Sequence, residues 1–226
     1  MNHIRRAAGT GAADTLLPAL SSVFSLLSEV FLEPEADVKV RLGEVIASCP
    51  AECPGLEGLP EALHRMMENC ESPNGQAMEY VRLFLHGNGN ATVHPYESVY
   101  THGHLMAPEC LDGWRTLHEA VGIRPRGDLH IPLDHLGLEL EFLAYTLSRL
   151  AAEADPEELE RLRTAAETAL RRHLVPFSRR FVARLTEARP SPYFAGAGVA
   201  LAEGLHACAL LLGLDLGSLA EFPAGQ

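Results

Sequence analysis

The sequence is poor in lysine, and it has far fewer basic than acidic residues. Lys39 is the only lysine among 226 residues, and 18 basic side chains stand against 30 acidic ones, for a formal net charge of −12. Binding a nucleic-acid backbone requires clustered lysine and arginine, which release counterions from the phosphates. The sequence has no such run, so we expect no nucleic-acid partner. A strongly acidic chain favours a cationic partner or serves solubility.

An export signal is also missing from the start of the sequence. Arg5 and Arg6 suggest a twin-arginine motif, but Gly9, Gly11 and Asp14 interrupt the apolar segment that should follow. Cysteine is scarce, and its count of five is odd. These features predict a reduced, cytoplasmic protein.

The cysteines do not form a recognisable metal motif. Cys49 and Cys53, with His64 and Cys70, offer the ligand types of a zinc site. However, three residues separate the first two cysteines, whereas common zinc knuckles have two. Ordinary loop and helix cysteines are the expected interpretation.

Long apolar runs are rare, and one of them resembles a membrane span. Residues Phe194 to Leu214 are mostly apolar and long enough to cross a bilayer. Glu203 and His206 lie in the middle, where an ionisable group costs about 2.5–3.5 kcal/mol. The segment therefore predicts a helix buried in protein, and no membrane span is expected.

Alternating strand patterns are absent, and helical periodicity recurs along the chain. The fold class predicted is all-α. The expected helices cover Leu16 to Leu32, Glu35 to Ala47, Leu59 to Asn69, Gln76 to His86, Glu109 to Val121, Asp134 to Glu153, Pro156 to His173, Pro176 to Glu187 and Tyr193 to Leu212.

The 47% hydrophobic content can form a substantial core. We expect residues 1–226 to form a single compact helical bundle of about nine to ten helices. The polar, proline-containing connection from Gly122 to Pro132 is a possible joint between two helical halves.

The stretch "HPYESVYTHGH", His94 to His104, is dense in functional side chains. Pro95 favours an extended conformation for His94. If the extension continues, Tyr96, Ser98 and Tyr100 share one side and form an aromatic groove wall. A structural loop pinned by its tyrosines is an equal alternative. Ser98 lacks the glycine elbow of a nucleophile.

The segment "IPLDHLGLELEFLAYTLSRL", Ile131 to Leu150, combines a core stripe with polar side chains. Asp134 stands at the expected N-cap of its helix, and His135, Glu139 and Phe142 share a face beside the leucine stripe. His135 and Glu139 are either two ligands, an acid–base pair, or a capped helix start. Glu141 lies about 200° away from Glu139 around the helix, so the two carboxylates cannot bind one ion.

The order of these segments resembles a known family. "EYVRLF" (Glu79 to Phe84) precedes "HPYESVY" (His94 to Tyr100), then "IPLDHLGLELEFLA" (Ile131 to Ala144) and "HLVPFSRRF" (His173 to Phe181). This order resembles the TorD/DmsD/NarJ family of redox-enzyme maturation chaperones over about Gln76 to Leu212. Two motifs are the most specific. The first is Tyr-x-x-Leu-Phe leading to Pro-x-x-Ser-x-Tyr, and the second is Pro-x-Asp-His at the start of a helix with Glu-Leu-Glu-Phe.

The resemblance implies a cytoplasmic, cofactor-free chaperone of the TorD-like fold, with no enzyme activity. Its partner would be the signal peptide or another segment of a molybdenum-cofactor oxidoreductase, held until cofactor insertion and kept from premature twin-arginine export. The peptide-binding residues carried over by match are Tyr80, Leu83, Phe84, Pro95, Glu97, Ser98, Tyr100, Pro132, Asp134, His135, Glu139, Glu141 and Phe142.

The residue chemistry is compatible with this reading. A signal peptide has a cationic start and an apolar, helix-prone run, so its receptor needs carboxylates beside an apolar groove. Glu97, Asp134, Glu139 and Glu141 are candidates for the first need, and Tyr80, Phe84, Tyr96, Tyr100 and Phe142 for the second.

A helical metal-dependent hydrolase is the alternative, and it would use His135, Glu139 and some of His94, His102 and His104. A monomer and a domain-swapped dimer are both compatible with the sequence.

Overall fold

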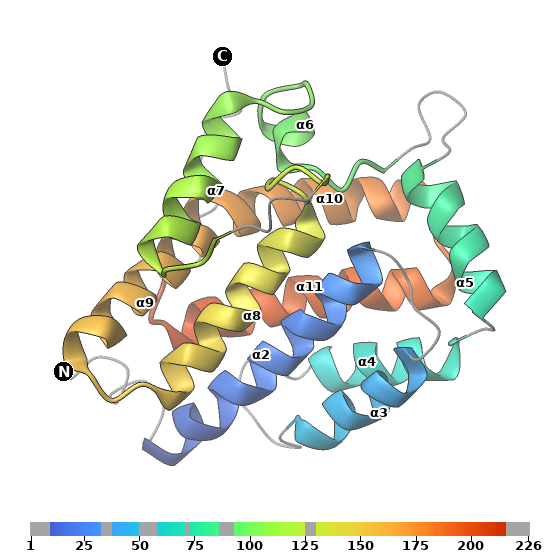
Figure 1. Ribbon diagram of the computed structural model, residues 1–226. Coiled ribbons are helices and arrows are strands. Elements are labelled where there is room, and N and C mark those ends of the chain that lie inside the picture. Colours follow the sequence, from blue (N-terminus) through green and yellow to red (C-terminus); the bar gives the residue numbers. More distant parts are fainter. Residues whose placement is uncertain are drawn as a thin grey trace.

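Helices make up most of the molecule in the computed structural model, which describes residues 10–32, 38–49, 58–70, 73–85, 93–124 and 130–215 (Figure 1). The described residues contain no β-strand, only an isolated bridge between Tyr96 and His135. The all-α prediction is confirmed. In chain order the elements are α2 (Thr10–Leu32), α3 (Val38–Ser48), α4 (Gly58–Glu68), α5 (Pro73–Tyr80), η1 (Val81–Leu85), α6 (Glu97–Thr101), α7 (Pro108–Ala120), α8 (Leu136–Ala152), α9 (Pro156–Thr168), η2 (Ala169–Leu174), α10 (Val175–Glu187) and α11 (Pro192–Leu211).

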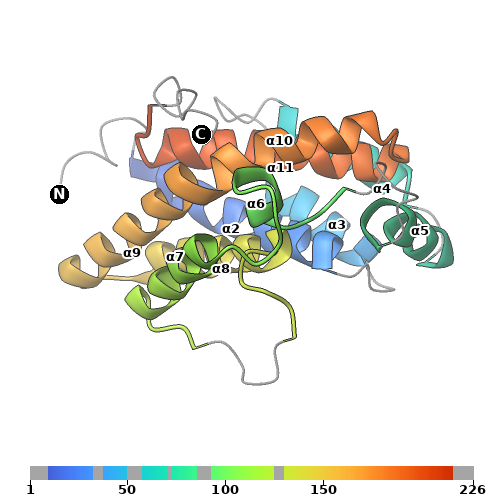
Figure 2. The same ribbon diagram turned by 90° about the horizontal axis from the view of Figure 1, so that it is seen from above.

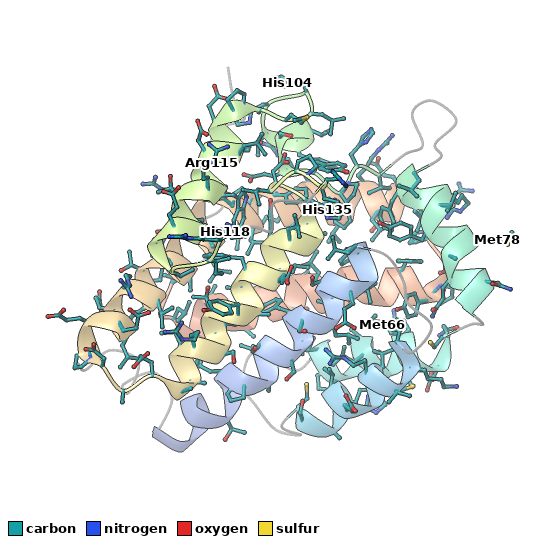
Figure 3. The ribbon with its side chains drawn as sticks, in the orientation of Figure 1. Met66, Met78, His104, Arg115, His118 and His135 are labelled. Carbon is teal, nitrogen blue, oxygen red and sulfur yellow. The ribbon has the colours of Figure 1, made fainter. Side chains whose placement is uncertain are left out.

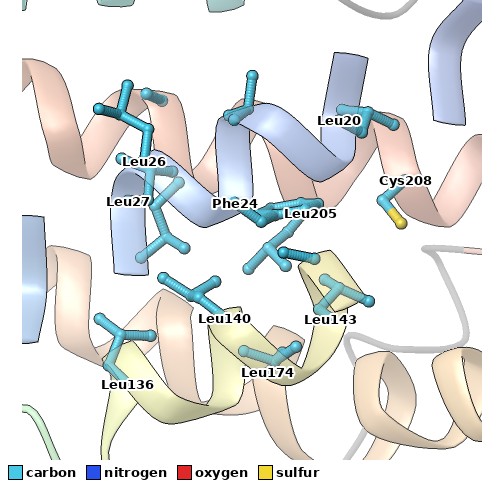
Figure 4. Packing of buried hydrophobic residues seen from close by; sticks show 14 of the residues in the cluster. Leu20, Phe24, Leu26, Leu27, Leu136, Leu140, Leu143, Leu174, Leu205 and Cys208 are labelled. Atoms are coloured by element: carbon cyan, nitrogen blue, oxygen red, sulfur yellow. The ribbon is translucent and has the colours of Figure 1, made fainter. Parts of the chain in front are cut away.

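The helices α2 and α8 form the most extensive packing in the molecule. The leucine stripe predicted on α8 is buried, and it meets leucines and Phe24 of α2 and residues of α11 (Figure 4). A Cβ at Gly137 would lie 2.4 Å from Cγ of Leu32, so this glycine permits the close approach of the two helices. Together they form the apolar centre on which the other elements pack.

The helix α11 lies against α2, α4 and α10, behind α2 and α8 in Figure 1. By length and composition, segments of two described helices could cross a membrane: Thr15–Leu32 within α2, and α11 itself. The fold buries 61% of the first segment and 67% of the second. Packing inside the molecule therefore accounts for their apolar character, as predicted for the later segment.

Local signals explain where several helices begin. Proline occupies the first turn of α7, α9 and α11, where its missing N–H leaves no hydrogen bond unmade. Asp155 caps α9 by accepting a hydrogen bond from the Glu157 N–H, at 3.1 Å. These signals are readable from sequence, and most predicted boundaries differ from the structure by only a few residues.

Two features of the elements differ from the sequence prediction. The stretch after Tyr96 turns into the short helix α6, so the extension considered from sequence as one possibility does not continue past Tyr96. The predicted helices Gln76 to His86 and Pro156 to His173 both change to wider π-helical turns, η1 and η2. Both turns carry residues of the site described below, and π turns are frequent at functional sites.

One cluster of buried apolar side chains draws on helices from α2 to α11. The expectation of a single domain remains a prediction, since the proposed joint at 122–132 includes residues 125–129, which lie outside the described ranges. Cys53 of the cysteine-containing loop lies outside them too.

Candidate functional site

The tyrosine-bearing loop and the start of α8 lie side by side. The Glu97 N–H donates to the Asp134 carbonyl at 2.9 Å, and the Leu136 N–H donates to the Pro95 carbonyl at 2.8 Å. These bonds surround the antiparallel bridge between Tyr96 and His135. The two segments singled out in the sequence are therefore joined through their backbones, although they are far apart along the chain.

Asp134 caps a different helix from the one predicted. Its Oδ2 accepts a hydrogen bond from the Ser98 N–H, at 3.1 Å, in the first turn of α6. The sequence placed Asp134 at the N-cap of α8, but His135 occupies that position. A carboxylate at a helix N-terminus satisfies a free N–H and interacts favourably with the helix dipole. This cap from α8's entry segment explains why α6 is helical and not extended.

His135 is a buried, structural N-cap. Its Nδ1 accepts a hydrogen bond from the Gly137 N–H at 3.1 Å, so that nitrogen carries no proton. Burial lowers the pKa of His135 to about 4, which favours the neutral ring. The ring lies edge-on to Tyr96, with centroids 5.0 Å apart (the position of His135 is labelled in Figure 3). The capped start considered from sequence paired His135 with Glu139. In the structure His135 is itself the cap, and neither oxygen of Glu139 has a hydrogen-bond partner among the described residues.

Glu97 is held by two residues that sequence reasoning did not place in the site. The Trp114 Nε1–H donates to Oε2 of Glu97 at 3.0 Å, and Nδ1 of His173 lies 2.9 Å from the same oxygen. All three side chains are buried. Gly113 permits this arrangement, because a Cβ there would lie 2.8 Å from Cε1 of His173. Two sequence features could have pointed to these partners of Glu97: Trp114 is the single tryptophan, and His173 opens the "HL" that precedes Val175 and Pro176.

Glu139 is a fully buried carboxyl group without an ordinary hydrogen bond. Neither of its oxygens has a partner of good geometry among the described residues. Desolvation, followed by the nearby charges of Glu97 and Asp134, raises the pKa of Glu139 well above the usual range. The protonated form is therefore favoured. Oδ1 of Asp134 and Oγ of Ser98 are likewise buried and unpartnered within the described parts of the chain.

This burial corrects the expected role of the carboxylates. Glu97, Asp134 and Glu139 are at most 2% exposed, so they cannot meet a cationic peptide at the surface. Glu141, on the opposite side of α8 from Glu139, is exposed. Glu97 joins α6 to α7 and η2, and Asp134 joins the entry segment of α8 to α6, whereas Glu139 is enclosed between them without a hydrogen bond to any described residue.

An open pocket of about 340 Å³ lies beside this network. Five residues predicted from the motifs line it: Tyr80, Phe84, Pro95, Tyr96 and His135. The remaining lining residues were not anticipated: Leu32, Ala77, Val81, Leu85 and Ile131. Leu85 is 60% exposed and Val81 is 37% exposed. The pocket and its rim thus form a largely apolar groove.

Other residues predicted to bind peptide have structural roles. Leu83 and Phe142 are buried in the core. Tyr100 packs its ring against Phe177 and Phe181, and the Pro132 carbonyl accepts the His135 N–H at 3.1 Å. None of these four lines the groove.

Tyr80 serves both the fold and the groove. Its hydroxyl donates to the carbonyls of Phe31 and Leu32 at the C-terminal end of α2. These carbonyls have no partner within the helix, so the tyrosine satisfies them. The ring forms part of the groove wall.

The histidines do not gather around a metal. Across the described residues, no group of three or more histidine, cysteine or acidic side chains is arranged to hold an ion. His102 contacts Cys110, with Nδ1 and Sγ 3.4 Å apart, and His104 is exposed. His135 faces the groove and Glu139 is enclosed. The geometry required by the hydrolase alternative is not observed in these ranges.

The fold and site define an all-helical protein with an apolar groove and an internal polar network, and comparison with known families agrees. Residues 50–183, more than half of the chain, match the family described as nitrate reductase delta subunit. The chain belongs to this family, which includes the TorD- and NarJ-type proteins, as the sequence motifs predicted.

Three relatives in this class are chaperone protein TorD from Vibrio cholerae serotype O1. Two strains show 29% identity over 129 residues, and a third shows 28% over the same length. The match covers 57% of this chain and 58% of each relative. The chain therefore spans less than two thirds of the relatives' length. Their name as chaperones agrees with the expectation of a protein without enzyme activity.

Proposed function

We propose that this protein is a cytoplasmic chaperone that matures a molybdenum-cofactor oxidoreductase. It binds the signal peptide or another segment of the catalytic subunit, holds it until the cofactor is inserted, and delays twin-arginine export. Family membership and the chaperone relatives support the general class. The groove between η1, the tyrosine loop and the start of α8 supports the peptide-binding step.

The observation that carries this proposal is the convergence of both family motifs on one open groove. Tyr80 and Phe84 come from the first motif, and Pro95 and Tyr96 from the segment that follows it. The second motif supplies His135. Exposed apolar side chains at the rim, Val81 and Leu85, have contact area to gain from a partner.

The chemistry of the groove selects the apolar part of a client segment. Its lining is dominated by aliphatic and aromatic side chains, and the nearby carboxylates are enclosed. An apolar helix laid into such a groove buries surface on both partners, which is the main source of affinity in helix-in-groove recognition. We therefore assign the groove to the apolar run of a leader and not to its cationic start.

The rim of the groove offers the sharpest test. Leu85→Asp and Val81→Asp place a charge at exposed positions, so the fold is retained while client binding weakens about tenfold or more. Leu210→Asp on α11 is the matched control, because Leu210 is 44% exposed and lies outside the groove. Calorimetric titration with synthetic leader peptides of the host's molybdenum oxidoreductases measures the affinities.

Equal affinity for the rim variants and the control would contradict the groove as the binding site. Alanine substitution of Asp134 and His135 tests the site less well, because each side chain accepts a backbone N–H at a helix start. Loss of binding in those variants would not separate contact with the client from damage to the fold.

A further inference from the structure

A second groove lies between α7 and α9, away from the one described above. These two helices are neighbours at the end of the molecule opposite α5, in both views of the ribbon (Figures 1 and 2). The groove between them has a volume of about 710 Å³. Its floor includes the buried Leu117 of α7 and Ala165 of α9.

The walls of this groove are more apolar than their residue types suggest. Thr116 and Thr168 both line it, and each hydroxyl donates to a carbonyl of its own helix, four residues earlier. Such back-bonding satisfies the hydroxyl donor locally. Ala120 and Thr164 add small, exposed side chains. Small residues let a partner helix approach closely, and little desolvation of polar groups is required.

The mouth of the groove is acidic. Glu157 and Glu160 line it, and neither has an ion-pair partner among the described residues. The one basic residue of the lining, Arg161, is already paired with Glu158. Glu157 lies in the first turn of α9, where the helix dipole accounts for a carboxylate. Glu160 lies one turn further along, where the helix dipole has little effect on a carboxylate.

We propose that the α7–α9 groove docks an amphipathic helix bearing arginine or lysine, as the cationic part of a client segment. The apolar face of the helix would lie over Leu117 and Ala165, and its basic side chains would meet Glu157 and Glu160. This inference deepens the proposed chaperone function and rests on it. It also supplies exposed carboxylates for a cationic ligand, which Glu97, Asp134 and Glu139 cannot provide because they are enclosed.

A defined probe peptide can test the groove with the full-length chain. The probe is a fluorescein-labelled synthetic helix of about 20 residues, with an apolar face and two arginines one turn apart. A second probe has glutamates in place of the arginines. Fluorescence anisotropy measures the affinity of each, at low and physiological salt.

Two variants at exposed positions address shape and charge separately. Thr164→Trp fills the groove without changing the net charge, and Glu160→Lys reverses a charge at its mouth. Glu109→Lys makes the same change of charge on an exposed residue of α7 outside the groove. We expect the first two to weaken binding of the cationic probe about tenfold or more, and Glu109→Lys to leave it within about twofold.

Salt and the acidic probe give the remaining expected results. Binding of the cationic probe should weaken as salt rises, because exposed charges are screened, and the acidic probe should bind more weakly than the cationic one. The proposal is overturned if the wild-type chain does not bind the cationic probe, or if Thr164→Trp binds it unchanged. Equal losses in Glu160→Lys and Glu109→Lys would show general charge attraction in place of a site. A concentration-dependent dimer that Thr164→Trp abolishes would assign the groove to a second copy of the chain.

This outcome is separable from that of the proposed function. If Glu160→Lys weakens binding of leader peptides while Leu85→Asp does not, the α7–α9 groove is supported and the groove at η1 is rejected. If only Leu85→Asp weakens binding of leader peptides, and Thr164→Trp leaves the affinity for the cationic probe unchanged, the groove at η1 is supported and the α7–α9 groove is rejected.

Discussion

His135 shows how one side chain can resemble a catalytic residue and serve the backbone. Its Nδ1 accepts the Gly137 N–H, so protonation of that nitrogen would break the cap at the start of α8. Burial acts in the same direction and lowers the pKa of His135 to about 4. A histidine in this state is neutral through most of the physiological range.

Acid should destabilise the protein through this residue. The pKa of His135 is near 6.5 in the unfolded chain and about 4 in the folded one, so its contribution is present above pH 6.5 and lost as pH falls toward 4. The loss amounts to about 3 kcal/mol. His135→Asn keeps an acceptor at the N-cap but cannot titrate, so the decline in unfolding free energy over this range should shrink. Urea denaturation at a series of pH values measures it.

The exposed His130 provides the control for this experiment. His130→Asn should leave the acid-induced decline as it is in the wild type. If His135→Asn declines as steeply as the wild type, another group causes the acid sensitivity and the neutral cap is wrong. At pH 7 the variant should be less stable by about 1 kcal/mol, because its side chain no longer contacts Tyr96.

Glu139 should have the opposite pH dependence. Its pKa is raised in the folded state, chiefly by burial, so its contribution to stability is full below its ordinary pKa and is lost as pH rises through the raised value. Glu139→Gln preserves the shape and removes the titration. Its unfolding free energy relative to the wild type should therefore increase between pH 5 and 8. Glu141→Gln, at an exposed position of the same helix, should show no such trend; a flat difference for Glu139→Gln would show that the buried carboxyl ionises without cost.

At the scale of elements, the site depends on contacts between segments that are distant in sequence. The cap of α6 comes from Asp134, and the partners of Glu97 come from α7 and η2. In η2 the Val175 N–H donates to the Leu170 carbonyl, five residues earlier, just before Pro176. Proline has no N–H for an α-helical bond, and the wider π turn accommodates it while turning His173 toward Glu97.

The close packing of α2 against α8 can be tested at a single glycine. A Cβ at Gly137 would lie 2.4 Å from Cγ of Leu32 and 3.1 Å from the Ser28 carbonyl oxygen. Gly137→Ala should therefore lower the unfolding free energy by about 1–3 kcal/mol, because the two helices must separate. Gly43→Ala, whose new Cβ would lie 3.7 Å from Cε of Met67, should be neutral or stabilising by up to about 1 kcal/mol. Thermal denaturation followed by circular dichroism compares them; equal stability of both variants would contradict the close approach.

At the scale of the whole molecule, the net charge of −12 is not concentrated where sequence reasoning placed it. Three of the four carboxylates assigned to the peptide site are enclosed, whereas Glu157 and Glu160 stand at the mouth of a second groove. An acidic chain can attract a cationic segment only through exposed carboxylates, since enclosed ones are occupied by internal contacts or hold a proton. Under the two proposals above, the two grooves would bind different parts of one client.

Much of the architecture was predictable because its signals are local. Apolar spacing located the long helices, and prolines in first turns marked several of their starts. Of the residues that the sequence assigned to peptide binding, Tyr80, Phe84, Pro95, Tyr96 and His135 line one groove, and their role in binding stays a prediction. The helix α6, the π turns and the partners of Glu97 were missed, because each depends on a contact made across the fold.

The sequence by itself determined the all-helical class, the stripes that form the core and the family to which the chain belongs. Its periodicity and motifs are local properties, and they persist whatever the chain packs against. Only the tertiary structure decided which carboxylates face solvent. Burial of Glu139 and exposure of Glu141, two residues away on the same helix, follow from the packing of α6, α7 and η2 over one side of α8. The exposure of a side chain depends on which elements pack around it, so it cannot be read from a local stretch of sequence.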